Sequence, residues 1–172
     1  MVGPDTPAPP GPLRLAELLA SVSLATDLGT GQPLGHGLRT CAIAAGLAGA
    51  LGCDAREVRV VHQFALLRFL GCTSDAAETA AVAGGDDRAF NAAMAPVVNG
   101  SGRELMGTFV RTVGAGRAPL RRAALVVRGL AELKGDGLAI HCEVAATLAA
   151  RAGLEQPVVH ALAHAYERWD GK

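Results

Sequence analysis

The sequence predicts an all-α protein folded as a single multi-helix bundle, and three observations support this fold class. Hydrophobic residues make up 50% of the 172-residue chain, but aromatic residues only 3%. The apolar residues are mainly alanine, leucine and valine, a set that suits closely packed helices better than a sheet. Apolar positions recur every three or four residues and nowhere alternate with period two. The chain is long enough for one domain with its own core.

The chain opens with a proline-rich segment and two helices. Residues 1–12 contain five of the nine prolines and are expected to form a flexible leader ahead of one helical domain, 13–172. An apolar periodicity from residue 13 predicts a first helix, which ends at the glycine- and proline-containing segment 27–35. A second helix is expected over 36–51. Because it is rich in alanine and glycine, we expect it to lie in the centre of the bundle.

Capping signals place the remaining helices. Asp54 followed by Glu57 has the spacing of a capping box and predicts a third helix that runs through Phe69 and is closed by Gly71. Four more helix starts carry an N-cap residue or a first-turn proline, namely Thr73 or Ser74, Asp86 or Asp87, Ser101 with Glu104, and Pro119. The last two helices are expected over 138–152 and from Pro157 onward, which gives a bundle of about eight or nine helices.

Charge is balanced over the whole chain but not along it. The formal net charge is zero, yet the segment 103–134 carries seven basic residues against two acidic ones. Such a segment suits an acidic partner, but we expect a solvated helix face whose bases pair with acids from elsewhere in the chain. Neutral overall charge and the lack of a clear helix-turn-helix pattern argue against nucleic acid as a partner.

The cysteines and the termini indicate a cytoplasmic protein with no membrane contact. Cys41, Cys53, Cys72 and Cys142 are widely spaced and form no C-x-x-C pair, so reduced thiols are expected. The first residues lack the basic and apolar regions of a signal peptide. No apolar run reaches the roughly 18 residues that a membrane-spanning helix needs.

Four blocks of the chain combine polar residues with alanine- and leucine-rich helices. They are "GHGLRTCAIAAGLAGALGCD" (35–54), "FALLRFLGCT" (64–73), "HCEVAATLAARAGL" (141–154) and "YERWDGK" (166–172). In this order they resemble the conserved blocks of the HD-domain phosphohydrolases, and of their HD-GYP branch in particular. The resemblance implies a helical bundle of HD-domain type. In active members, histidines and aspartates hold metal ions that activate a water for attack on a phosphodiester.

The resemblance also implies which residues would form the site, and where the site is degenerate. His36 and His141 match two metal ligands of the family, whose ions would be iron, manganese or zinc. The central His-Asp pair of the family is replaced by Arg68 and Phe69. A guanidinium stays protonated and a phenyl ring has no donor atom, so neither replacement binds a metal. No cofactor is therefore expected, and a metal only if a residual site on His36 and His141 survives.

Arg68 and Arg39 are the candidate anion-binding residues. Arg68 puts a permanent positive charge where the family would hold a metal ion. We expect it either to bind a phosphate or carboxylate bidentately, or to pair with an acid such as Glu143 or Glu167. Arg39 lies one turn after His36 and is the second candidate. Both outcomes for Arg68 require that it is buried rather than solvent-facing.

The end of the chain offers a second set of metal-ligand types. His160, His164 and Glu167 lie at i, i+4 and i+7, a spacing that places three ligands on one helix face. The opposite face of the expected helix carries large apolar residues, Val158, Leu162, Tyr166 and Trp169. Because an apolar face turns toward the core, we expect the histidine face to be solvated.

The expected function follows from this partial loss of ligands. The chain is expected to be a degenerate, non-catalytic HD-GYP-like domain that senses a small anionic ligand or contacts a protein partner, in signalling or transcription regulation. A homodimer and an output domain following Lys172 are compatible with that role. The alternative is a metal-dependent phosphohydrolase, acting as a phosphodiesterase, with a reduced metal site built on His36 and His141.

Overall fold

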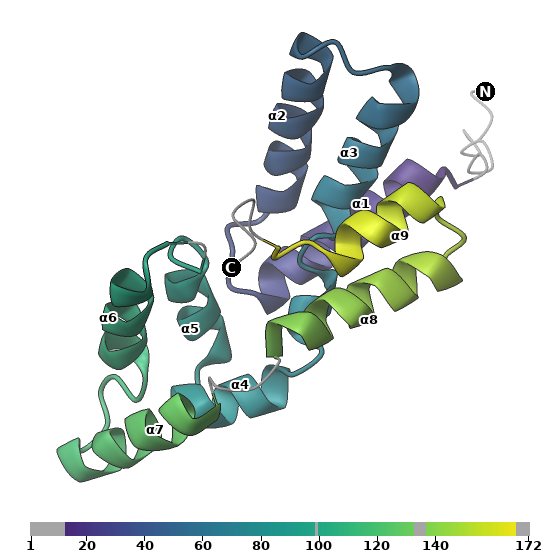
Figure 1. The fold of residues 1–172 in the computed structure, drawn as a ribbon. Coiled ribbons are helices and arrows are strands. Elements are labelled where there is room, and N and C mark those ends of the chain that lie inside the picture. The colour runs from purple at the N-terminus through teal and green to yellow at the C-terminus, as the bar shows by residue number, and fades with distance from the viewer. Residues whose placement is uncertain (1–12, 99, 133–136, 168–172) are drawn as a thin grey trace, which may run out of the picture.

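The computed structural model describes residues 13–98, 100–132 and 137–167, and every regular element in this part of the chain is a helix (Figure 1). It contains nine α-helices and a short 3-10 helix, without any strand within those ranges. The predicted all-α class is therefore confirmed. The expected leader 1–12 and Trp169 lie outside the described residues. No helix in the described ranges is at once long and apolar enough to cross a bilayer.

The helices form two groups that lie side by side in Figure 1. The first group contains α1 (Leu15–Gly29), α2 (His36–Ala50), α3 (Ala55–Leu67), the 3-10 helix η1 (Leu70–Thr73), α8 (Gly137–Arg151) and α9 (Gln156–Ala163). The second group contains α4 (Ala76–Ala83), α5 (Asp87–Met94), α6 (Gly102–Thr112) and α7 (Pro119–Glu132). The chain thus leaves the first group after η1 and returns to it with α8.

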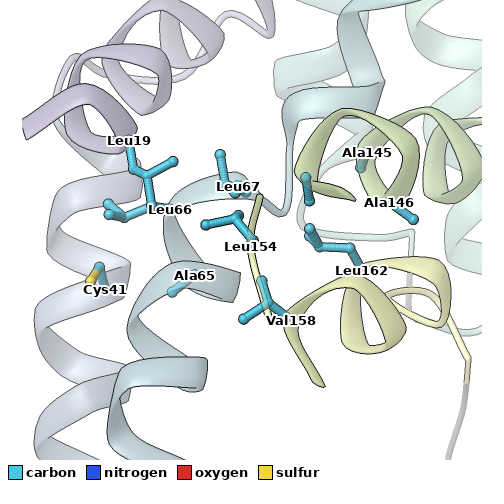
Figure 2. Close-up of a cluster of buried hydrophobic side chains, with 11 residues drawn as sticks. Leu19, Cys41, Ala65, Leu66, Leu67, Ala145, Ala146, Leu154, Val158 and Leu162 are labelled. Atoms are coloured by element: carbon cyan, nitrogen blue, oxygen red, sulfur yellow. The ribbon is translucent and has the colours of Figure 1, made fainter. Parts of the chain in front are cut away.

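The core of the first group lies where α1, α3, α8 and α9 meet (Figure 2). Leu66 and Leu67 of α3 belong to one buried cluster with Val158 and Leu162 of α9, and both α9 residues are fully buried. The α8 face that joins them is made of small residues, Ala145, Ala146 and Ala149. Burial of each large apolar side chain contributes roughly 1.5–3 kcal/mol, and the alanines let α8 and α9 approach closely.

The second group has its own core around Phe109 of α6. The ring of Phe109 is buried and meets Phe90 of α5 edge to face, with 5.9 Å between the ring centroids. Gly129 of α7 lies over the same ring, and an added Cβ there would come within 2.6 Å of Cζ of Phe109. The glycine therefore lets α7 pack directly on α6.

The predicted capping boxes are present, and one predicted cap is wrong. The Asp54 carboxylate accepts from the backbone N–H of Glu57, and Ser101 pairs with Glu104 in the same way. The predicted cap of α4 by Thr73 or Ser74 is not seen, because both hydroxyls donate backward to carbonyls of η1 and its start. The N-cap position of α4 is instead held by Asp75, whose side chain makes no capping hydrogen bond.

The prediction that the second helix lies in the centre is wrong. Figure 1 shows α2 at the edge of its group, beside α3. Ile43 and Leu47 are 73% and 59% exposed, and an added Cβ at Gly46 or Gly49 would meet nothing within 4 Å. Small residues permit close approach on any face of a helix, but they do not require a neighbour there.

The start of α2 rests on a buried carboxylate that the sequence pattern did not single out. Asp27 of α1 is fully buried, and its Oδ1 accepts from the backbone N–H of Gly37 at 3.1 Å. An added Cβ at Gly37 would overlap the Ser23 hydroxyl, so only glycine fits against α1 there. A negative charge at a helix N-terminus is favourable, because the free N–H groups point toward it. Asp27 therefore joins α1 to α2.

Some of the clustered bases bind backbone carbonyls instead of the acids we expected. Nη2 of Arg117 donates to the carbonyl of Gly84 at 2.6 Å, just after α4. Nη2 of Arg122 donates to the carbonyls of Val110 and Arg111 near the end of α6. Cations are favourable at helix C-termini, where carbonyls lack helical partners. Arg117, just before α7, is therefore bound to the end of α4, and Arg122 binds α7 to the end of α6.

Candidate functional site

A cavity of about 620 Å³ is lined by residues of both helix groups. Its lining comes from the ends of α1 and α3, from η1, from α4 to α7, from the start of α8 and from the turn after α9. The volume falls in the range of about 300–1,000 Å³ that is typical of small-molecule sites. Of the residues named from the sequence, Arg68 and His141 line this cavity, whereas His36 and Arg39 do not.

The polar end of the cavity is formed by side chains that are far apart in the sequence. Arg68, Cys72 and Asp75 come from the connection between α3 and α4, His141 from the first turns of α8, and Tyr166 from the turn after α9. Only Arg68 and His141 of this set were expected as site residues.

A glycine contact holds this end of the cavity together. An added Cβ at Gly71 would overlap the carbonyl oxygen of His141 and lie against its Cα. The backbone of η1 therefore touches the backbone of α8 directly. This contact sets Cys72, the next residue, beside the imidazole of His141.

His141 is paired with Asp75 across the two groups. Nε2 of His141 lies 2.9 Å from Oδ1 of Asp75, while the N-terminus of α4 is left without that carboxylate as a cap. The contact is an ion pair without the geometry of a directed hydrogen bond, and neither ring nitrogen has such a bond to any residue that the structure describes. The Cys72 side chain and then Asp75 raise the pKa of His141 to about 9 against the opposing effect of burial. At neutral pH the imidazole is therefore a cation.

Tyr166 closes the polar end from the side of α9. Its hydroxyl lies 3.3 Å from Sγ of Cys72. Burial is the main cause that raises the pKa of Tyr166, with a further contribution from Cys72. The phenol consequently stays protonated over the physiological range. The sequence had placed Tyr166 on a long final helix, but α9 ends at Ala163, and Tyr166 reaches the cavity from a turn.

Arg68 is half-buried and lines the cavity without an acidic partner in the described ranges. Its Cζ lies 4.5 Å from the ring centroid of Phe69, a cation–π distance. The expected pairing with Glu143 or Glu167 is not seen. Glu143 is exposed, and Glu167 lies instead 3.6 Å from Nε2 of His164. The N–H groups of the Arg68 guanidinium therefore remain available to a ligand that accepts hydrogen bonds.

His36 and Arg39 lie apart from this set. The ring of His36 packs against the ring of Phe69, with 5.9 Å between centroids. Arg39 is exposed, and its Nη1 donates to the carbonyl of Leu34 at 3.2 Å. Arg39 acts here as a local backbone contact. Of the two anion candidates, only Arg68 faces the cavity.

The side chains do not fit a metal ion of the kind that the resemblance implies. Within the described part of the chain, no three His, Cys, Asp or Glu side chains surround a common point at metal-ligand range. Asp75 and Cys72 are directed at the imidazole of His141, and His36 contacts a phenyl ring. A guanidinium and a phenyl group stand where two donors would be needed.

The histidines near the end of the chain are solvated, as predicted. His160 and His164 are exposed and their rings stack with 4.2 Å between centroids. Nδ1 of His164 lies 2.7 Å from the carbonyl oxygen of His160. Because α9 ends between them, they do not form the single helical stripe that the spacing suggested.

The remaining cavity wall is mainly apolar and was not recognised from the sequence. It is formed on the second helix group by Val82, Phe90, Met94, Val98, Leu105 and Phe109. A signal was present, since Phe90 with Met94 and Leu105 with Phe109 are i, i+4 apolar pairs that mark one helix face. Nothing in that pattern distinguished a cavity wall from a filled core.

Comparison of this chain with family models, with curated proteins and with solved structures gives no match. The likeness to HD-domain proteins consequently rests on the four sequence blocks alone.

Proposed function

We propose that this chain is a non-catalytic sensory domain that binds a small anion in the cavity through Arg68. One observation carries the proposal: Arg68 is a permanent cation on the wall of a cavity of about 620 Å³, and no described carboxylate pairs with it. Removing a charge from water without pairing it costs free energy. An anion that enters the cavity recovers that cost, and a guanidinium can bind a carboxylate or phosphate through two parallel hydrogen bonds.

The proposal includes descent from the HD-GYP-like proteins with loss of their chemistry. Its support is the order of the four blocks and the positions of the residues that they contain. Arg68 and His141, which the resemblance places in one site, line the same cavity. His36 contacts Phe69, which also lines it. Phe69 of the degenerate pair thus contacts one residue that matches a ligand, and Arg68 shares the cavity with the other.

The absence of catalysis is proposed from the donor set. Hydrolysis in the family depends on a water activated by metal ions, and here two of the donor positions are Arg68 and Phe69. The imidazole of His141 is engaged by Asp75 at 2.9 Å. The replacement that weakens a metal site also favours an anion site, because the permanent positive charge of Arg68 takes the place of bound metal cations.

A ligand in this cavity contacts both helix groups, so binding can change how the two groups are arranged relative to each other. The polar wall belongs mainly to the first group and the apolar wall to the second. A ligand that binds one relative arrangement of the groups more tightly shifts the population toward it. Binding is thereby converted into a change that a partner protein or a neighbouring domain can recognise.

The test is calorimetric titration of the purified chain with acetate, benzoate and inorganic phosphate. At least one anion should bind, and Arg68→Gln should weaken that binding by more than about tenfold. Arg39→Gln removes an exposed arginine outside the cavity and should leave the affinity unchanged. Binding that survives Arg68→Gln would overturn the proposal. Stoichiometric iron, manganese or zinc in protein purified without chelator would do so too, in favour of the phosphodiesterase.

A further inference from the structure

The wall of the cavity changes character from one helix group to the other. Arg68, Cys72, His141 and Tyr166 belong to the first group, and Asp75 stands just before α4 where the groups meet. Within α4, Glu78 and Thr79 add polar groups to the wall; beyond α4, the part of the wall that α5 and α6 form is apolar except for Asn91. A ligand that fills the cavity therefore meets a charged end and an apolar end.

The apolar end is a genuine hydrophobic surface. Phe90 is partly exposed on the wall, and the buried ring of Phe109 packs edge to face behind it and holds it in place. Met94 and Leu105 add flexible aliphatic surface from α5 and α6. Such a wall gains free energy from apolar groups and offers few partners to a polar ligand, which would lose its hydration there.

The charged end favours a single negative charge. Arg68 is the one guanidinium among the described residues of the wall, and Asp75 and Glu78 place two carboxylates on the same wall. Asp75 is already paired with His141. A dianionic head would gain one Arg68 contact but would be repelled by Glu78, whereas a planar carboxylate head matches the guanidinium in charge and shape.

We propose that the cavity binds an amphipathic monoanion, a carboxylate whose head pairs with Arg68 and whose hydrocarbon chain lies against Phe90, Met94 and Leu105. This inference rests on the proposed function and names its ligand class. The chain would pass from the first helix group to the second, so both groups are needed for full affinity. A free small anion would use only the Arg68 end.

The experiment compares straight-chain ligands on the unmodified chain by calorimetry. Acetate, hexanoate and decanoate vary the tail, decanol removes the charge, and decyl phosphate and inorganic phosphate double it. Affinity should rise by roughly fourfold per buried methylene along the carboxylates. Decanoate should bind more than about tenfold tighter than decanol and tighter than decyl phosphate.

Two variants test separately how the charged end and the apolar end of the cavity contribute to the affinity for decanoate. Arg68→Gln should weaken decanoate more than about tenfold and leave decanol unchanged. Ala95→Leu fills part of the apolar end and should weaken decanoate but not acetate, whereas Ala77→Leu, an exposed site on α4 outside the cavity wall, should change neither. If Arg68→Gln does not fold, the comparison of decanoate with decanol on the unmodified chain still decides.

The outcomes separate this inference from the proposed function. If acetate or phosphate binds as tightly as decanoate and depends on Arg68, the amphipathic ligand is wrong and the anion site stands. If decanol binds as tightly as decanoate, or Arg68→Gln changes nothing, both fail. Absence of binding by every compound in the series also overturns both.

Discussion

Nε2 of His141 lies 2.9 Å from Oδ1 of Asp75, a carboxylate that occupies the N-cap position of α4 without capping it. Instead of capping α4, the Asp75 side chain contacts His141 of α8, which belongs to the other helix group. The contact places a cation and an anion side by side on the wall of the cavity. The pH dependence of the protein's stability should follow from it.

The first prediction concerns stability and pH. The pKa of His141 is raised to about 9 in the folded protein, above the value of about 6.5 in an unfolded chain. Because the folded state holds the proton more tightly, the stabilisation is complete below about pH 6.5 and is lost as the pH rises through 9. Between pH 6 and pH 9.5 the free energy of unfolding should fall by about 2 kcal/mol, allowing for solvent screening at the partly exposed Asp75.

Urea denaturation at several pH values measures this change, and two variants identify its source. His141→Gln should flatten the pH dependence. His160→Gln alters an exposed histidine and should leave it as it is. An NMR titration of Asp75→Asn should show a lower pKa for His141. An unchanged pKa in that variant would contradict the role given to Asp75.

A second prediction concerns Gly71. Its Cβ-free backbone touches the carbonyl of His141, so Gly71→Ala forces η1 and α8 apart and should destabilise the fold by about 2 kcal/mol or more. The same variant should weaken ligand binding, because Cys72 and His141 are then displaced. Gly46→Ala is the matched control: its added Cβ meets open space inside α2, and it should stabilise the fold by about 0.5–1 kcal/mol. Equal melting temperatures for the two variants would exclude the contact.

A third prediction concerns the start of α2. Asp27→Ala removes the fully buried carboxylate that accepts from Gly37 N–H, and should cost about 1–3 kcal/mol in unfolding free energy. Asp54→Ala removes an exposed cap of α3 and should cost about 1 kcal/mol. Thermal unfolding of both variants gives the comparison. A smaller loss at Asp27 than at Asp54 would show that the buried carboxylate contributes little.

A fourth prediction tests the proposed descent from HD-GYP-like proteins. The double substitution Arg68→His with Phe69→Asp restores the family's donor pair between His36 and His141. If these positions derive from a metal site, the double variant should bind manganese or zinc in a calorimetric titration more tightly than the unmodified chain does. Adding His36→Gln should abolish the gain. A folded double variant with no gain in metal affinity would argue that the sequence blocks are not related to that family.

Much of the fold was predictable because helix starts are local. The capping boxes that begin at Asp54 and Ser101 each depend on two residues three positions apart, and both boxes are present. The place of α2 was not predictable, since glycine and alanine are equally compatible with a packed and an open face. The cap of α4 was mispredicted for a related reason. Asp75 pairs with His141, 66 positions later in the sequence, instead of capping α4. A pattern read over a few neighbouring residues cannot reveal such a distant partner.

The site was predictable only in part. Arg68 and His141 were found because they stand in blocks with a recognisable order, and both line the cavity. Cys72 and Asp75 were missed, since a lone thiol and a carboxylate near a helix start have ordinary local roles. Their roles arise from the approach of η1 to α8, a tertiary contact.

The close fit of Gly71 against the His141 carbonyl also constrains how this protein can have diverged. Any substitution at residue 71 requires a new path for α8, whereas the apolar residues of the cavity wall can be exchanged singly for others of similar size. Glycine at this position should therefore persist in distant descendants whose pockets have adapted to different molecules. Sequences that share it, but differ at Phe90 or Leu105, would mark lineages with an inherited scaffold and a changed ligand preference.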